Sequence, residues 1–202
     1  QPPGWSGVFV LNEGNFQWGN ASISFYKYSD ESVKSDVFYD ANNRPLGDVG
    51  QSVCFYDDKL FIVVNNSGKV EVVNPDDFKS IATITGLLSP RYFLGINSSK
   101  AYVSDMSSNS ISVIDINDYA KTTSIKCIGS TEEMLLYNNK VYVSNTTNEY
   151  IYIIDTSIDK ITDSIKTVYG PNSMVIDKND NLWVISMGSY FPEVVGSLQK
   201  IN

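Results

Sequence analysis

The sequence predicts an all-β chain folded as a β-propeller of four-stranded antiparallel blades. The first observation is a repeat: GVFVLN, KLFIVV, KAYVSD, KVYVSN and NLWVIS recur along the chain, each with an aromatic residue at its third position. These aromatics are Phe9, Phe61, Tyr102, Tyr142 and Trp183, at intervals of 52, 41, 40 and 41 residues. The second observation is composition: the runs are rich in Val, Ile, Tyr and Phe and are separated by Asn, Asp, Ser and Gly, as in short strands. A fixed period in this range is typical of propeller blades.

Each repeat contains a further strand pair after this motif. The segments KVEVVNPDDFKSI, SISVIDINDYAKTTSI and YIYIIDTSIDKITDSI begin at residues 69, 110 and 150. Asn74, Asp115 and Asp155 end the first apolar run of each, where an Asx side chain starts a tight turn. A fourth run follows at 51–56, 91–96, 133–137 and 172–177. Four strands therefore fill each period, and no helix is expected.

The apolar runs have many consecutive rather than alternate apolar residues, which indicates sheets covered on both faces. A β-sandwich also has short strands, but it gives no reason for similarity at a fixed period. We therefore expect one partial propeller domain over residues 1–202, with about 4.5 blades of an expected seven. Blade 1 lacks its inner strand (7–39), three complete blades follow (51–86, 91–129 and 133–169), and a fifth is incomplete (172–202). Open edges and blade faces would remain, so we expect either two to three further blades in the natural chain or association through those faces.

Composition excludes several classes of function. The net charge is −8, which opposes a surface that follows nucleic-acid phosphates. The chain has no His, which removes His-based triads, His general bases and the commonest metal ligand. We expect no catalytic residues, no metal and no cofactor. Cys54 and Cys127 are expected to be separate thiols, and the longest apolar stretches are too short to span a membrane.

Several segments resemble the YncE-like β-propellers of Bacteroidota cell-surface lipoproteins. They are GVFVLNEGN, PLGDVGQS, VVNNSGKVEVV, LSPRYFL, KAYVSDMSSNSISVID, EEML and GPNSMVIDKNDNLWV. The resemblance implies export, a place on the outer-membrane surface and a seven-bladed ring. The sequence opens at Gln1 without a lipid-attachment Cys, so any membrane association would need a lipid anchor not present in this chain. Some similar proteins capture corrinoids such as cobalamin ahead of an outer-membrane transporter, and others have no assigned ligand.

In a propeller, the loops that enter the innermost strand and those that join the second and third strands open on one face, where ligands bind. The mixture of amides and aromatics expected there suits a large neutral ligand, and a corrinoid or an oligosaccharide fits equally well. The predicted ligand-binding residues are Phe16, Trp18, Asn12, Glu13, Asn65, Arg91, Tyr92, Asp105, Glu133, Asn145, Asn172 and Tyr190. Phe16 and Trp18 lie in a loop inserted in the first repeat, where no strand explains an aromatic residue.

Each candidate also has a structural interpretation. Asn and Asp are common turn formers, and Arg91 could pair with Asp48 or Asp105. The run 177–181 resembles the start of a calcium loop but lacks its Gly and Glu, so it is interpreted as a turn. Glu132 and Glu133 are adjacent on one strand and should point to opposite sides, which argues against glycoside hydrolysis.

The sequence thus predicts a non-enzymatic cell-surface binding propeller, with cobalamin as the most concrete ligand. The first alternative is a protein-interaction or structural platform in the cell envelope, and the second is a lyase or glycosidase acting on a polysaccharide.

Overall fold

The computed structural model describes residues 6–201 and contains two compact units. The first unit comprises residues 6–93 and 117–121, and the second comprises residues 94–116 and 122–201.

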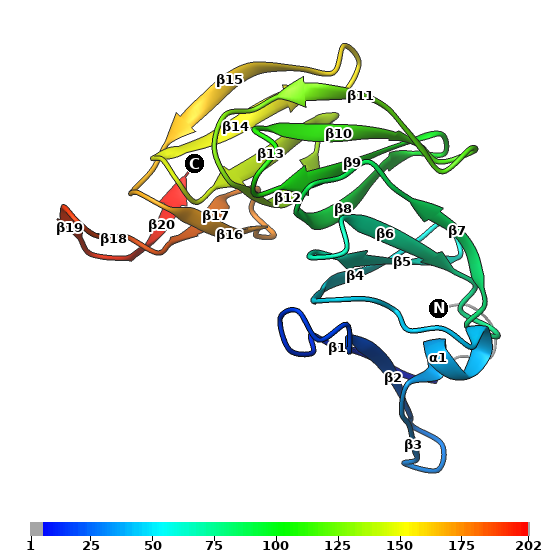
Figure 1. The fold of residues 1–202 in the computed structure, drawn as a ribbon. Coiled ribbons are helices and arrows are strands. Elements are labelled where there is room, and N and C mark those ends of the chain that lie inside the picture. The colour runs from blue at the N-terminus through cyan, green and yellow to red at the C-terminus, as the bar shows by residue number, and fades with distance from the viewer. Residues whose placement is uncertain (1–5, 202) are drawn as a thin grey trace. The chain divides into compact units, whose positions relative to one another are not determined.

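The first unit contains a three-stranded and a four-stranded antiparallel sheet (Figure 1). The three-stranded sheet has the order β1 (Gly7–Asn12), β2 (Ser22–Lys27) and β3 (Val33–Lys34). The four-stranded sheet has the order β4 (Gly50–Tyr56), β5 (Lys59–Val64), β6 (Lys69–Val73) and β7 (Ser80–Ile84). Consecutive strands pair, so each sheet is a meander.

A short helix, α1 (Val37–Asn42), follows β3, so the expectation of no helix is wrong. The sequence VFYDAN has strand-like residues at its start, but the side chain of Asp36 accepts a hydrogen bond from the backbone N–H of Tyr39 and caps a helical turn. Asn43 ends the helix with a positive φ of 52°. Val37 and Phe38 are fully buried. Their burial holds the helix at the end of the segment 7–39, where only strands were expected.

The core of the first unit lies between its two sheets. Phe9, Leu11 and Phe25 pack against Leu60, Ile62 and Val64. We call the face that a sheet turns toward the next sheet along the chain its forward face, and the opposite face its backward face. In these terms, the forward face of β1–β2–β3 packs on the backward face of β4–β7.

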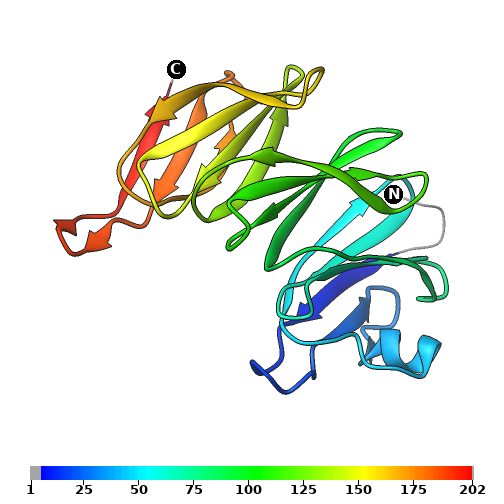
Figure 2. The ribbon, with the colours of Figure 1, turned by 45° about the horizontal axis from the view of Figure 1, so that its top comes forward.

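The second unit contains most of one four-stranded sheet, a complete four-stranded sheet, a three-stranded sheet and a two-stranded hairpin (Figure 2). The first has the order β11 (Ala120–Lys126), β10 (Ser110–Asp115), β9 (Lys100–Asp105) and β8 (Pro90–Asn97). Residues 90–93 of β8 and 120–121 of β11 belong to the first unit. The next sheet has the order β12 (Thr131–Tyr137), β13 (Lys140–Asn145), β14 (Tyr150–Asp155) and β15 (Lys160–Lys166).

The last sheet of the second unit has three strands, in the order β16 (Pro171–Ile176), β17 (Leu182–Ser186) and β20 (Ser197–Ile201). A separate hairpin of β18 (Ser189–Tyr190) and β19 (Glu193–Val194) lies between β17 and β20 in the sequence. This hairpin was not predicted from the sequence. Asn202, the last residue of the predicted third strand of this repeat, lies outside the described residues.

The core of the second unit repeats the arrangement of the first. Leu135, Tyr142 and Ile151, on the forward face of β12–β15, pack against a backward face that includes Met174, Leu182 and Val184. Because cross-strand partners share a face, the pairs Leu135–Tyr142 and Met174–Val184 fix these assignments.

The predicted hairpin turns and separate thiols are present. The side chains of Asn74 and Asp155 accept hydrogen bonds from the backbone N–H groups of Asp76 and Ser157, at 2.9 and 2.8 Å. Cys54 in β4 and Cys127, directly after β11, are free. Within residues 6–201 no helix is long and apolar enough to cross a membrane.

Candidate functional site

The loop between β1 and β2 presents two exposed aromatic side chains. Phe16 and Trp18 are 63% and 75% exposed. The loop is closed by its own hydrogen bonds: the N–H of Trp18 donates to the carbonyl of Asn15 at 3.0 Å, and the N–H of Asn15 donates to the side chain of Asn20 at 2.7 Å. The aromatic side chains therefore extend from an ordered turn.

Asp48 ties this loop to the turn between β5 and β6. Its Oδ2 accepts hydrogen bonds from the N–H of Gln17 at 2.8 Å and from the side-chain amide of Asn66 at 2.6 Å. Its own N–H donates to the hydroxyl of Ser67 at 2.9 Å. The other carboxylate oxygen, Oδ1, is buried and has no hydrogen-bond partner among the described atoms. Gln17 stands between Phe16 and Trp18, so Asp48 holds the tip of the loop. The base is held by the N–H of Ala21, which donates to the carbonyl of Gly47 at 3.0 Å.

Most of the other predicted site residues of the first unit differ from Phe16 and Trp18 because their side chains form hydrogen bonds within the unit. The side-chain amide of Asn12 donates to the hydroxyls of Ser22 and Ser24, and that of Asn65 donates to Ser89 Oγ and to the carbonyl of Pro90. Arg91 donates to the side-chain oxygen of Gln51. Glu13 is exposed, and Tyr92 is half-buried in β8. Asn12, Asn65 and Arg91 therefore have a structural role within the unit.

The predicted polar residues of the second unit also bond their neighbours. Asp105 accepts hydrogen bonds from the N–H groups of Ser107 and Ser108, and Asn145 donates to the carbonyl of Ile128 and accepts from Thr147. Glu133 accepts a hydrogen bond from the N–H of Met174 at 2.6 Å. Asn172 lies close to the sulfur of Met187. The structure places these residues at the ends of neighbouring strands, with their side chains already partnered.

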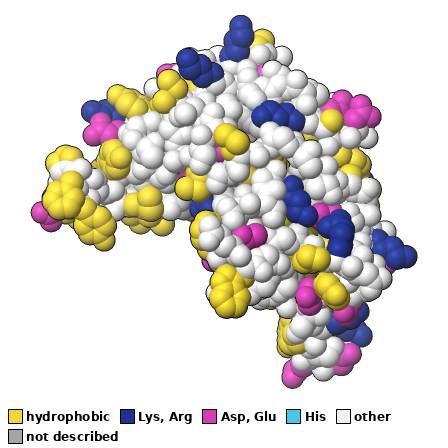
Figure 3. Space-filling model, viewed as in Figure 1, with side chains coloured by type: hydrophobic (Ala, Val, Ile, Leu, Met, Phe, Trp, Pro, Cys, Tyr) yellow, Lys and Arg dark blue, Asp and Glu magenta, His cyan; other side chains and the backbone are white. Residues whose placement is uncertain are grey.

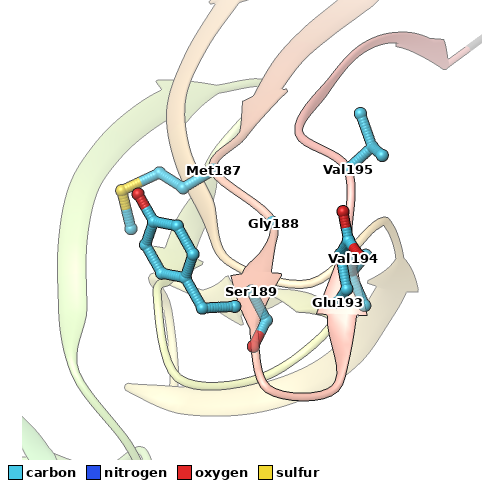
Figure 4. A pocket seen from close by; sticks show the side chains of 7 residues that line it. Met187, Gly188, Ser189, Glu193, Val194 and Val195 are labelled. Carbon is cyan, nitrogen blue, oxygen red and sulfur yellow. The ribbon is translucent and has the colours of Figure 1, made fainter.

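The hairpin between β17 and β20 is the counterpart of the Phe16 and Trp18 loop in the second unit. Tyr190 and Phe191 at its tip are almost fully exposed, and Met187 and Val195 at its base are also exposed. Met187, Gly188 and Ser189 on one side and Glu193, Val194 and Val195 on the other line an open hollow of about 470 Å³, together with Tyr190 (Figure 4). The hairpin projects beyond the ends of β17 and β20 (Figures 1 and 2).

Of the exposed residues of this hairpin, only Tyr190 was predicted from the sequence, and Met187, Phe191 and Val195 were not. The feature of the sequence that could have identified these residues is the length of their loop. The connection between the second and third strands covers residues 65–68 in one sheet and 146–149 in another, but 187–196 here and 13–21 in the first sheet. Long second-to-third-strand connections with aromatic tips thus occur in both units. Hydrophobic side chains gather at the hairpin on the face seen in Figure 3.

Asp177 confirms the interpretation of residues 177–181 as a turn. Its carboxylate accepts hydrogen bonds from the indole N–H of Trp183 at 2.9 Å, the side-chain amide of Asn181 at 3.0 Å and the backbone N–H of Asn179 at 2.8 Å. The bond from Trp183, followed by those from Asn181, holds the pKa of Asp177 well below its usual value. Across residues 6–201 no three His, Cys, Asp or Glu side chains form a group that could hold a metal ion.

Known structures share this fold. The extracellular domain of a protein described as a hybrid two-component system, from Bacteroides thetaiotaomicron, is 10% identical with a TM-score of 0.74, over 99% of this chain and 26% of that one. A quinonprotein alcohol dehydrogenase-like protein from the same organism is 13% identical with a TM-score of 0.69, over 98% and 49%. The WD40 β-propeller domain of Doa1 is 12% identical with a TM-score of 0.61, over 84% and 58%. The chain therefore spans less than two thirds of each of these structures.

These similarities confirm the predicted fold class: the four-stranded antiparallel sheets are β-propeller blades. At such low identity they show the fold alone. No curated protein matches the sequence. Residues 6–202 match the family described as a domain of unknown function, DUF5074. The chain therefore belongs to the DUF5074 family, and its fold is that of a β-propeller.

Proposed function

We propose that this chain is a non-catalytic ligand-binding module of the cell envelope, and that the loop between β1 and β2 makes a principal contact with the ligand. One observation carries the proposal: Phe16 and Trp18 are exposed on a loop that is fixed by hydrogen bonds at its tip and base. An ordered aromatic side chain loses little conformational entropy on binding, so its buried area contributes efficiently to affinity.

The polar groups around the aromatics favour a large, amide-bearing ligand. Asn15, Gln17 and Asn20 lie in the same loop, and Asn66 lies beside its anchor Asp48. Amide side chains both donate and accept hydrogen bonds, and the indole and phenyl rings offer flat apolar surface. A corrinoid such as cobalamin combines a flat macrocycle with peripheral amides. It is therefore the ligand that we propose for the loop.

We place the protein outside the cytoplasm, at the outer-membrane surface, with a transporter as a partner. The support is the resemblance to YncE-like surface proteins, together with the extracellular location stated for one Bacteroides protein of the same fold. A non-catalytic role is supported by the carboxylates. Glu133 and Asp105 are engaged by backbone N–H groups, and the absence of His excludes the commonest general base.

A protein-docking role is the second candidate, and the hairpin between β17 and β20 favours it. Phe191 is 95% exposed next to Tyr190, and Glu193 is the only charged residue between Met187 and Val195. Exposed aromatic residues of this kind are typical anchors of protein interfaces.

The experiment is equilibrium dialysis of the chain against cyanocobalamin, with binding read from cobalamin absorbance. We expect saturable binding that Trp18→Ala weakens at least tenfold. Tyr39→Ala, which removes a half-exposed aromatic on α1, is the matched control and should leave the affinity unchanged. Unaltered binding by Trp18→Ala would exclude the loop as the contact, and no binding at all would exclude the corrinoid.

A further inference from the structure

The turn between the third and fourth strands carries an aromatic side chain in two of the sheets. The ring of Phe78, in the β6–β7 turn, lies 5.7 Å from that of Phe9 and 6.2 Å from that of Phe25, measured between ring centres. Tyr119 has the same position in the β10–β11 turn and is half-buried. Its turn, residues 117–121, belongs to the first unit together with the preceding sheet. An aromatic ring at this position is therefore a regular part of the repeat.

Asp159 replaces the aromatic residue in the β14–β15 turn. The three residues Phe78, Tyr119 and Asp159 each stand four positions after the Asn or Asp that follows the apolar run, and their φ values are 60°, 52° and 54°. The N–H of Phe78 donates to the carbonyl of Asn74 at 2.9 Å, and the N–H of Asp159 donates to the carbonyl of Asp155 at 3.0 Å. The turns therefore share one backbone conformation, and the difference lies in the side chain.

The carboxylate of Asp159 contacts the preceding sheet through hydrogen bonds instead of ring packing. Its Oδ1 accepts from Lys100 Nζ at 2.7 Å and from the hydroxyl of Tyr102. Tyr102 is the repeated aromatic residue of β9, as Phe9 is of β1, and it is fully buried. Within residues 6–201 the other oxygen of Asp159, Oδ2, has no hydrogen-bond partner, and the side chain is 27% exposed. One oxygen of this carboxylate is therefore available to a ligand.

The smaller side chain leaves an open pocket of about 230 Å³ within the second unit. Val113 forms part of its wall and pairs with Tyr102, whereas the first sheet pairs Phe25 with Phe9. Both differences from the first unit remove a ring from this space. The pocket is lined by residues of two complete sheets, β11–β10–β9–β8 and β12–β13–β14–β15, and not by residues of the first or last sheet.

The wall of the pocket carries hydroxyl groups and charges of both signs. Its polar members are Ser99, Lys100, Asp115, Thr122, Thr123 and Asp159. The hydroxyl of Thr122 donates to the carbonyl of Val113, and that of Ser99 donates to the side chain of Asn97, so both hydroxyl oxygens can still accept a hydrogen bond. An anion in this pocket would face two carboxylates, and a cation would face the ammonium group of Lys100. The wall therefore favours a neutral ligand that both donates and accepts hydrogen bonds.

We propose that this pocket binds a pyranose ring, either as a free monosaccharide or as the terminal unit of an oligosaccharide. The first unit accommodates a six-membered ring at the equivalent position, where Phe78 packs on Phe9 and Phe25. A pyranose has the same ring size, and its hydroxyls can donate to Asp159 Oδ2 and bond the hydroxyl of Thr123. A phenyl ring has no donor for that carboxylate oxygen, and covering the oxygen without a donor costs free energy. The pocket contains no residue of the β1–β2 loop, so this inference does not depend on the ligand proposed for that loop.

The test is an NMR titration of the isotope-labelled chain with the methyl pyranosides of glucose, galactose, mannose and N-acetylglucosamine at millimolar concentration. We expect at least one of them to bind saturably and to shift the backbone amide signals of residues 99–100, 122–123 and 159. Oligosaccharides that end in the same unit form the second arm. Equal affinity for both ligands would assign the pocket to a single ring, and tighter binding of the oligosaccharide would assign it to the end of a glycan chain.

Three variants locate the site. Asp159→Phe restores the ring found in the other two turns and should abolish the shifts, because the ring occupies the pocket. Ile158→Phe is the matched control: it adds the same ring to the same turn, at a side chain that is 55% exposed and outside the pocket wall, and should leave the affinity unchanged. Thr123→Val, at an exposed position of β11, removes one wall hydroxyl without altering the turn and should weaken binding about threefold.

Several results would overturn the inference. They are the absence of shifts with all four pyranosides, shifts confined to residues outside the pocket, and binding that Asp159→Phe leaves intact. The shift map of the wild type and the affinity of Thr123→Val give an answer that does not depend on the folding of Asp159→Phe. Trp18→Ala separates this inference from the proposed function, because it should weaken cobalamin binding and leave pyranoside binding unchanged. Loss of pyranoside binding in Trp18→Ala would instead place the sugar at the β1–β2 loop.

Discussion

Replacing Glu71 with Gln should destabilise the first unit by about 3 kcal/mol, because the carboxylate of Glu71 is fully buried among donors. It accepts hydrogen bonds from Arg44 at 2.6 Å, from Lys69 at 2.8 Å and from the hydroxyl of Thr83 at 3.2 Å, and from Ser80 as well. An amide in its place turns an NH₂ group toward cations. Removing one partner of a buried ion pair costs about 3 to 5 kcal/mol. The side chain of Arg44 is 41% exposed and can turn to water, which places the expected cost at the lower end.

The assay is urea unfolding of the wild type and Glu71→Gln across a pH series. Burial favours the neutral acid, but the hydrogen bonds from Arg44, Lys69 and Ser80 outweigh it and hold the pKa of Glu71 below its ordinary value of 4.5. A carboxyl group whose pKa is lowered by folding stabilises the protein above its unfolded-state pKa. The difference between the two proteins should therefore be complete at pH 7 and shrink as the pH falls below about 4.5.

Glu149→Gln is the matched control. Glu149 pairs with Lys166 at 3.2 Å, but both side chains are largely exposed, so its loss should leave the unfolding midpoint unchanged. Equal stability of the wild type and Glu71→Gln at pH 7, or a difference that does not vary with pH, would refute the role assigned to the buried carboxylate.

Two other predictions concern buried groups. Burial raises the pKa of the Cys127 thiol to about 12 and also raises the pKa of the Cys54 thiol. Neither thiol should therefore react with Ellman's reagent at pH 8 in the folded chain, whereas both should react in guanidinium. Rapid labelling of the native protein would contradict this prediction. Asn65→Ala should cost about 1 to 3 kcal/mol in urea unfolding, because it removes the bonds to Ser89 Oγ and to the Pro90 carbonyl, and the second of these acceptors is buried. An unchanged unfolding midpoint would show that water replaces the amide.

The sequence predicted the fold class because the information is local and repeated. Short runs such as residues 60–64 and 141–145 predict strands, and their common period predicts the blade. The helix α1 was not predicted because Val37, Phe38 and Tyr39 have strand-like side chains. Its formation depends on the cap from Asp36 and on the burial of Val37 and Phe38. A short segment of this kind is decided by tertiary packing rather than by propensity.

The candidate site could be predicted from the sequence only in part, for a related reason. Phe16 and Trp18 could be predicted as exposed because no strand partner explained them. Glu71 gave no such signal, since it stands inside the apolar run KVEVV and its partner Arg44 lies 27 residues earlier in the chain. Sequence likewise could not separate a ligand-facing Asn from Asn65 or Asn145, whose amides bond the carbonyls of Pro90 and Ile128.

The ladder between β17 and β20 stays in register from Leu182–Ile201 to Ser186–Ser197, although residues 187–196 are inserted at its end. The extra segment therefore adds surface without changing the register of either strand. The stability of the blade and the binding properties of the connection can therefore change independently. The connection can be lengthened, shortened or substituted while β17 and β20 keep the same cross-strand pairs. New binding properties can thus arise at these connections at little risk to folding.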